Sequence, residues 1–461
     1  MSLEGALAAN RFGLGARPGE IEAASTDPKA WLLGQLPDDD SASRFAGLPT
    51  TSALVVDLGK RRHARQARDR EAIKAFLTKS RQGHLLEMVA RFRAGFETAL
   101  PFRERLVRFW SNHFVVSTQK PDAALFVGAF EREAIRPYVT GRFSDMVLAV
   151  ECHPAMQLYL DNAQSIGPDS YAGMRARRGL NENLGREILE LHTLSVDGGY
   201  TQDDVIALAK ILTGWSLDLG PGPAAGLMNA AMGGAGDGAF RFYPPRHQPG
   251  PKTLLGRSYA QGFDGGVAAL ADLANHPATA RHIARKLAIH FIADDPPQDS
   301  VKRIEMAFLA SGGDLPSVYE TIIDDPAAWS PEPVKFRTPI EYVTAAMRLA
   351  GGERSAMLDE NGVRPFIQSA RAMGESPFAA PSPKGWPDDA DSWTGSDAIL
   401  QRVEWANAAA QKLGPQSDPV NLADQGLGPL LSADTRTAIA RAASPAQGLA
   451  ILFASPEFQR R

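Results

Sequence analysis

Apolar residues recur every three or four positions over most of the chain, which is the spacing of one face of an α-helix. Segment 101–113 shows this pattern clearly, because Phe102, Leu106 and Phe109 fall on one stripe. The same spacing predicts helices over three further segments: 181–194, 201–212 and 278–292. The pattern therefore predicts a mainly α, multi-helix globular body.

A Gly- and Pro-rich insertion, residues 219–256, interrupts the helical pattern. A connection of that length is usually a lid, a binding loop or a disordered insert. Within it, residues 240–243 and 253–255 alternate like strands, and we expect them to pair as a small β-hairpin. A second Pro- and Gly-rich run, residues 376–388, predicts an ordered surface loop that carries Trp386.

Composition narrows the chemistry and the compartment. The single cysteine, Cys152, excludes an intramolecular disulfide framework and any cysteine-based zinc or iron–sulfur cluster. Residues 1–20 lack the basic start and apolar run of a signal peptide, and no stretch of about 18 apolar residues occurs anywhere. We therefore expect a soluble, cytoplasmic protein without a transmembrane segment.

Positive charge is concentrated in one part of the chain. Residues 51–110 carry 14 Lys and Arg against 6 Asp and Glu, whereas the whole chain has a net charge of −4. No aromatic residues are interleaved with the densest run, 60–74, so a solvated helix face is favoured over nucleic-acid binding. Binding to nucleic acid would require this run to join the basic segment 281–290 as one continuous patch.

One predicted helix carries two carboxylates beside its apolar side. Asn183, Glu187 and Glu190 stand at positions i, i+4 and i+7 and share one stripe. The favoured interpretation is a buried structural network with arginines such as Arg186 and Arg11; the alternatives are a catalytic acid–base pair and a metal site. Helical metal sites normally carry Glu-x-x-His, which is absent here, so no metal is predicted.

Glu187 and Glu190 are accordingly the candidate catalytic residues, and Asn183 is a candidate ligand-binding residue. We expect Glu187 to be substantially buried and bonded to a cationic or amide side chain. The sequence specifies no cofactor. It contains neither a phosphate-binding glycine loop nor a Gly-x-Ser-x-Gly motif, which disfavours nucleotide hydrolysis and α/β-hydrolase chemistry.

Histidines and lysines supply the remaining candidates. His113 ends the apolar stripe of 101–113 and is more typical of a core histidine, although a pocket role is open. His247 and Lys252 lie on the predicted hairpin loop, where an exposed loop is favoured over a cationic clamp for an anion. His192 is expected to be a packed or surface residue. The basic side of 278–292 is expected to be a solvated face, with anion docking as the alternative.

Several motifs in the chain resemble those of the bacterial family called domain of unknown function 1800. They lie at residues 10–15, 153–156, 159–162, 179–183, 190–194, 197–201, 212–215, 276–280 and 385–388. The resemblance implies one family-wide helical domain over residues 1–461, with members that are commonly exported and often encoded beside a partner family. The chain departs from the pattern at Gln248, where an Asp often follows the histidine.

The resemblance implies a fold and a set of positions, and it names no reaction. The leading functional hypothesis is an accessory protein that binds a protein partner. The alternatives are an enzyme whose pocket is floored by Glu187 and Glu190 and roofed by the loop with His247, and a nucleic-acid-binding protein that uses its basic helices.

Overall fold

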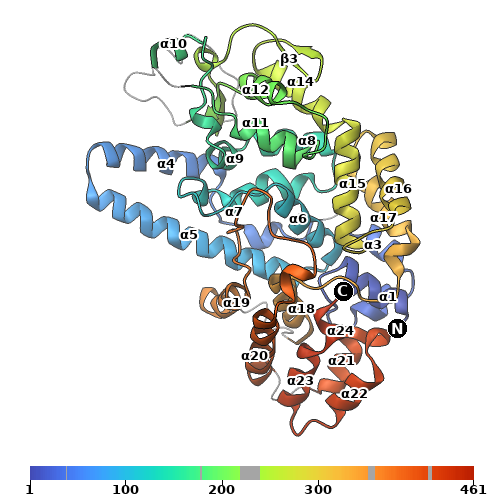
Figure 1. Cartoon of the computed structure of the whole chain (residues 1–461). Helices are drawn as coiled ribbons and strands as arrows, with labels where there is room; N and C mark the ends of the chain where they lie inside the picture. The colour runs from blue at the N-terminus through green and yellow to red at the C-terminus, as the bar shows by residue number, and fades with distance from the viewer. Residues whose placement is uncertain (38, 177–178, 219–238, 351–358, 414–417) are drawn as a thin grey trace.

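The computed structural model describes residues 1–37, 39–176, 179–218, 239–350, 359–413 and 418–461. Within these ranges helices dominate, and the strands form two separate antiparallel two-stranded sheets (Figure 1). The predicted mainly α fold with a small hairpin is therefore confirmed. None of the helices in these ranges combines the length and the apolar character needed to span a bilayer.

The N-terminal part forms three short helices and then a long helical hairpin. These are α1 (Leu3–Leu7), α2 (Glu20–Ala24), α3 (Pro28–Leu33), α4 (Thr51–Gln66) and α5 (Arg70–Glu97). Thr50 and Asp69 cap α4 and α5, because their side-chain oxygens accept the N–H groups of the first turn. The last buried residue of α4 is Arg61 and the first of α5 is Glu87, so residues 62–86 extend from the body as an arm (Figure 1).

The central helices pack around one large apolar core. They are α6 (Pro101–His113), α7 (Val127–Phe130), α8 (Phe143–Cys152), α9 (Pro154–Tyr159), α10 (Gly173–Ala176), α11 (Asn183–Glu187), α12 (Gln202–Ile211), α14 (Phe263–Ala274), α15 (Pro277–Phe291), α16 (Gln298–Ser311) and α17 (Leu315–Asp324). The stripe predicted on α6 is buried, with Phe102, Leu106 and Phe109 at most 6% exposed. The pattern therefore identified the buried side of this helix correctly.

Short π and 3₁₀ turns connect or extend these helices. The π turns are η1 (Ala8–Phe12), η4 (Glu131–Ile135) and η7 (Ile188–His192). The 3₁₀ turns are η2 (Ala42–Phe45), η3 (Ala123–Leu125), η5 (Arg136–Tyr138), η6 (Asn162–Gln164), η8 (Pro244–Arg246), η9 (Pro326–Trp329), η11 (Asp391–Trp393) and η12 (Gly428–Leu430). Turn η7 extends α11, and its last carbonyls shape the candidate site described below.

The strands pair differently from the sequence prediction. β1 (Trp215–Leu217) pairs with β2 (Phe240–Phe242), and β3 (Lys252–Leu254) pairs with β4 (Arg257–Tyr259). The predicted pairing of 240–243 with 253–255 is wrong, because each run has a different partner. Leu255 and Gly256 both have positive φ, so β3 turns back at once on β4 through a two-residue turn. Residues 219–238 of the insertion lie outside the described ranges.

The C-terminal helices build a second apolar core together with the last turns of α5. They are α18 (Pro339–Ala350), α19 (Glu360–Ala372), α20 (Ser396–Leu413), α21 (Pro419–Leu427), α22 (Ala433–Ala440), α23 (Pro445–Ala454) and α24 (Pro456–Gln459). Phe92 and Phe96 of α5 are buried in this core. The single domain over residues 1–461 stays a prediction.

The run 376–388 is an ordered loop with Trp386 held near its end. Asn112 of α6 donates to the Trp386 carbonyl at 2.9 Å and accepts the Trp386 N–H at 2.8 Å. Gly385 has a φ of 89°, and a side chain there would collide with the Asn112 carbonyl. The loop is therefore fixed against α6, where it covers one side of a cleft.

Candidate functional site

A cleft of about 520 Å³ opens between α6, α15, the first turn of α18 and the loop that follows α19. This volume lies within the usual range of small-molecule sites. His282, Lys286 and His290 stand four residues apart on α15 and so reach the cleft from one face of that helix. The solvated basic face predicted for this helix therefore applies only to Arg281 and Arg285, which are exposed.

Two histidine rings in the cleft are oriented by the end of the π turn η7. His113 Nε2 donates to the carbonyl of His192 at 3.1 Å, and His282 Nε2 donates to the carbonyl of Leu191 at 3.1 Å. A carbonyl only accepts, so each ring carries a proton on Nε2. Nδ1 of a neutral His113 is then an acceptor, and the Lys286 ammonium lies 2.9 Å from it.

Both rings are neutral near pH 7. Burial, with the nearby Lys286 ammonium, lowers the pKa of His282 to about 4 and holds the pKa of His113 well below its ordinary value. A neutral His113 keeps its Nδ1 lone pair, which is the atom that faces Lys286. The ring was expected to be a core histidine, and it is indeed buried, but it also lines the cleft.

Lys286 is a mostly buried cation that lines the cleft. Burial lowers its pKa to about 8, although the charge of Asp388 opposes the shift. Lys286 makes no ion pair with any carboxylate in the described ranges, whereas buried lysines are normally paired. A substantial part of the Lys286 population is therefore the neutral amine at slightly alkaline pH.

Glu375 brings an acid to the same cleft. It is 7% exposed, and the Ile340 N–H donates to its Oε2 at 2.8 Å. Burial raises the pKa of Glu375 to about 7, with the Ile340 N–H opposing the shift. The cleft thus holds a lysine and a carboxyl group whose pKa values both lie close to neutrality, a combination that suits acid–base chemistry.

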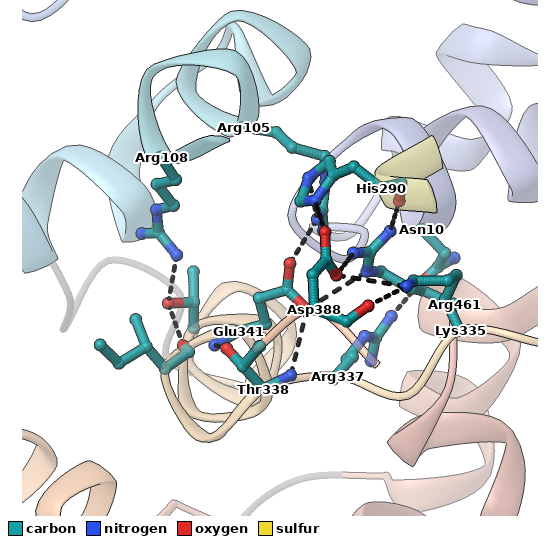
Figure 2. A network of polar contacts seen from close by, with 12 residues as sticks. Asn10, Arg105, Arg108, His290, Lys335, Arg337, Thr338, Glu341, Asp388 and Arg461 are labelled. Carbon is teal, nitrogen blue, oxygen red and sulfur yellow. Dashed lines mark hydrogen bonds and ion pairs between the residues drawn. The ribbon is translucent and has the colours of Figure 1, made fainter. Parts of the chain in front are cut away.

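Arg108 is a second cation of the cleft that makes no ion pair within the described ranges. Its Nη1 donates to the Thr344 hydroxyl at 3.1 Å (Figure 2). Gly95 of α5 makes room for the guanidinium, because a Cβ at that position would overlap Arg108 Nη2. An arginine placed in a cleft without its own anion is suited to bind the anionic group of a ligand.

A buried ionic network closes one end of the cleft (Figure 2). The Glu341 carboxylate is paired with Arg105 and lies 3.2 Å from Arg461 Nε. Burial alone would raise the pKa of Glu341, but the two arginines outweigh it and hold this pKa well below its ordinary value. Glu341 is therefore a permanent anion that joins α6, α18 and residue 461.

Asp388 extends this network from the loop. Its Oδ2 accepts from His290 Nδ1 at 2.5 Å, and its Oδ1 lies 3.3 Å from Lys335 Nζ and 3.5 Å from Arg461 Nη2. Burial would raise the pKa of Asp388, but these neighbours keep it below its usual range. Burial lowers the pKa of His290 to about 4, so this ring is neutral and donates to the carboxylate. The network therefore anchors the loop to α15.

The carboxylates predicted from the sequence lie elsewhere. Glu187 and Glu190 are half-buried, Asn183 is exposed, and none of the three lines the cleft. Glu190 pairs with Arg186 at 3.4 Å in a partly exposed ion pair. The expectation that Glu187 is bonded to a cation or an amide is wrong within the described ranges, because its stripe borders the core without entering it. Their catalytic and ligand-binding roles stay predictions.

His247 and Lys252 are buried, not exposed on a loop tip. Lys252 Nζ lies 3.1 Å from His247 Nε2, which also accepts the Gly262 N–H at 2.9 Å. His247 Nδ1 donates to the Thr213 carbonyl at 2.9 Å. The expected exposed loop is wrong because the tight β3–β4 turn folds this segment back onto α12. The pair does not line the cleft, and its ligand-binding role stays a prediction.

Three further sequence expectations concern His192, Arg11 and possible metal ligands. His192 is buried and donates from Nδ1 to Glu151 at 2.7 Å, in agreement with a packed histidine. Arg11 donates to the carbonyls of Ala328 and Glu332 and does not meet Glu187. Among the described residues, no cluster of three or more His, Cys, Asp or Glu side chains is arranged to hold a metal ion.

Sequence reasoning missed Lys286, Glu375, Arg108 and Asp388 as site residues. The four-residue spacing of His282, Lys286 and His290 could have indicated that they share one face of the helix and so reach a common site. Nothing local marked Glu375, and Asp388 stood out only as the last residue of the family-like motif 385–388. They reach the cleft only because the chain returns to α15 after about a hundred residues, as the separation of 98 between His290 and Asp388 shows.

Replacing Glu375 with Gln should stabilise the protein at pH 8 and change little at pH 4. The raised pKa means that the native state binds more protons than the unfolded state between about pH 4.3 and pH 7, so stability is lost as pH rises through that window. Gln mimics the neutral acid, so urea unfolding should give a gain of about 1–3 kcal/mol at pH 8. Glu404→Gln, on an exposed side of α20, is the control. Equal effects of the Glu375 variant at both pH values would contradict a buried neutral acid.

Comparison with known proteins agrees with the resemblance in the sequence. The family model described as protein of unknown function (DUF1800) matches residues 7–460. No curated protein and no solved structure matches the chain. Since the match covers nearly the whole length, the chain belongs to the DUF1800 family.

Proposed function

We propose that the protein is an enzyme that acts on a small anionic molecule in the cleft, with Lys286 as the reacting base. The observation that carries the proposal is the position of Lys286, whose ammonium has no ion-pair partner in the described ranges and lies 2.9 Å from His113 Nδ1. A buried charge without a partner is unfavourable for folding, so its retention in an open cleft is typical of a functional group.

The arrangement supports transfer of protons in both directions. Lys286 can lose a proton at mildly alkaline pH and accept one from the substrate, while His113 Nδ1 is positioned to take a proton from Lys286. Glu375 retains its proton close to neutral pH and would act as the acid. This proposal keeps the carboxylate-based enzyme predicted from the sequence but assigns the carboxyl group to Glu375 instead of Glu187 and Glu190.

Arg108 defines the substrate class. It reaches the cleft from α6, and within the described ranges its side chain donates a hydrogen bond only to the Thr344 hydroxyl. Carboxylates and phosphates are the groups that a guanidinium binds best. A cleft of about 520 Å³ would hold a molecule of metabolite size beside it.

The partner-binding role predicted from the sequence is the second candidate, and the arm is the observation that favours it. The arm, residues 62–86, extends from the body, and two apolar residues of this hairpin are exposed: Val56 at its base is 55% exposed and Leu77 on the arm is 43% exposed. Complementation of a strain from which the gene is deleted tests the two roles. If Lys286→Met restores the phenotype of the strain but the double variant Val56→Asp, Leu77→Asp does not, the partner-binding role is favoured. If the double variant restores it and Lys286→Met does not, the enzyme is favoured.

Nucleic-acid binding is still not expected, because the two basic segments do not form one patch. Lys286 and His290 face the cleft, and α15 lies on the far side of the body from the arm (Figure 1). A cytoplasmic location is inferred from the sequence alone. Cell fractionation with an antibody against the native chain tests it, and recovery outside the cytoplasm would contradict it.

Replacing Lys286 with Met should raise the free energy of unfolding at pH 7 by about 1–3 kcal/mol. The native pKa of about 8 lies below the unfolded value, so the unfolded state binds more protons between about pH 8 and pH 10.4 and the wild type gains stability as pH rises there. The advantage of the variant should therefore shrink at pH 9.5. Lys74→Met on the exposed part of α5 is the matched control. A loss of stability at pH 7 would mean that Lys286 is a structural cation.

Small anions should stabilise the protein through Arg108. Phosphate, citrate and succinate are suitable probes for a thermal-shift screen, and a ligand at 100 times its Kd adds about 2.7 kcal/mol. Arg108→Met should abolish the stabilisation, whereas Arg285→Met, an exposed arginine on α15, should leave it unchanged. If no anion stabilises the wild type, or if both variants respond like it, the substrate class is wrong.

A further inference from the structure

We infer that Lys286 is a nucleophile that forms an imine with the carbonyl carbon of an anionic aldehyde or ketone, such as a 2-oxo acid. The inference rests on the proposed function and adds to it the covalent role of Lys286 and the carbonyl class of the substrate. Three features carry it: the proton acceptor beside the amine, the absence of an ion-paired carboxylate within the described ranges, and Arg108 in the same cleft.

A proton acceptor lies beside the amine. An amine that attacks a carbonyl must lose a proton as the C–N bond forms, so an acceptor beside the amine directly assists a nucleophilic lysine. His113 Nδ1 lies 2.9 Å from Lys286 Nζ. Its lone pair is kept available because the Nε2 proton is committed to the His192 carbonyl. The backbone of η7 thus determines which nitrogen faces the lysine.

The surroundings of the amine also keep it reactive. A lysine bonded to a carboxylate stays protonated, and Lys286 has no such partner within the described ranges. The Asp388 carboxylate, which could have supplied one, is instead occupied by His290, Lys335 and Arg461. The network at the end of the cleft therefore leaves the amine free for a substrate.

The steps balance without an oxidant or reductant. The neutral Lys286 Nζ donates its lone pair to the carbonyl carbon, and the π electrons of the C=O bond move to oxygen. One N–H proton passes to His113 Nδ1, and the protonated Glu375, the acid of the proposed function, gives its proton to the oxygen, which yields a neutral carbinolamine and the Glu375 carboxylate. The C–O bond then breaks, a proton from the His113 imidazolium leaves with the hydroxyl as water, and nitrogen supplies the electrons of the C=N bond. The product is a protonated imine, with the substrate's anionic group held by Arg108.

Reductive trapping tests this inference on the full chain. The protein is incubated with glyoxylate, pyruvate or 2-oxoglutarate and sodium cyanoborohydride, which reduces the C=N bond to a stable secondary amine. Peptide mass spectrometry then locates the adduct. Lys286 should be modified at least about tenfold faster than any other lysine, with a rate that rises through pH 8.

The chain supplies two internal controls. Lys384 also lines the cleft but has no histidine partner in the described ranges, so it tests whether access alone is sufficient. Lys252 has a pKa of about 8 and lies 3.1 Å from His247, but it is away from the cleft, so it tests whether a lowered pKa is sufficient. Both should stay largely unmodified.

Two variants complete the test. Arg108→Met should slow trapping of the anionic probes but not of uncharged acetone, and His113→Gln should slow trapping of all of them by about tenfold or more. Unfolding curves of each variant show that the fold is retained. The inference is overturned if Lys286 is modified no faster than Lys384 or Lys252, or if His113→Gln reacts like the wild type. If trapping fails while anions still stabilise the protein through Arg108, the covalent step alone is wrong; if both fail, the proposed function fails as well.

Discussion

The pairing of Glu341 with Arg105 and Arg461 is the interaction on which the site depends. A carboxylate this deeply buried is tolerated only with cations beside it, because the loss of hydration would otherwise exceed any local gain. The two arginines also bind carbonyls, since Arg105 donates to Gly13 and Arg461 donates to His290. One charge therefore holds together α6, α18, the turn after η1 and the end of α15.

The charged side chains of the cleft differ in whether they are ion-paired, and this difference leaves some of them available to a ligand. At one end, Asp388 is surrounded by His290, Lys335 and Arg461, so its carboxylate is fully engaged (Figure 2). Along the rest of the cleft, Lys286 and Arg108 are cations without paired anions in the described ranges. The paired end makes the site rigid, and the unpaired cations provide groups that a ligand can satisfy.

The described residues include two Lys–His pairs in which burial lowers the pKa of the lysine to about 8, and these pairs differ in their surroundings. Lys252 and His247 are enclosed by the β3–β4 turn, where backbone groups satisfy the histidine on both nitrogens. Lys286 and His113 have similar electrostatics but border a cleft. The two pairs therefore differ not in the pKa of the lysine but in access, since only Lys286 and His113 line the cleft.

The sequence by itself determined the helical fold, the buried stripe of α6, the family and the ordered loop with Trp386, because each depends on residues close together in the chain. The same local reasoning expected His247 and Lys252 to be exposed, and there it failed, because both are buried. It also placed the candidate carboxylates on α11, where they do not line the cleft and where their role stays a prediction. Helical spacing gives the direction of a side chain but not the element that meets it. Tertiary structure brought Glu375 and Asp388 into the same cleft as Lys286. Only the completed packing decided which charges were paired, because desolvation depends on the full set of neighbours from distant segments.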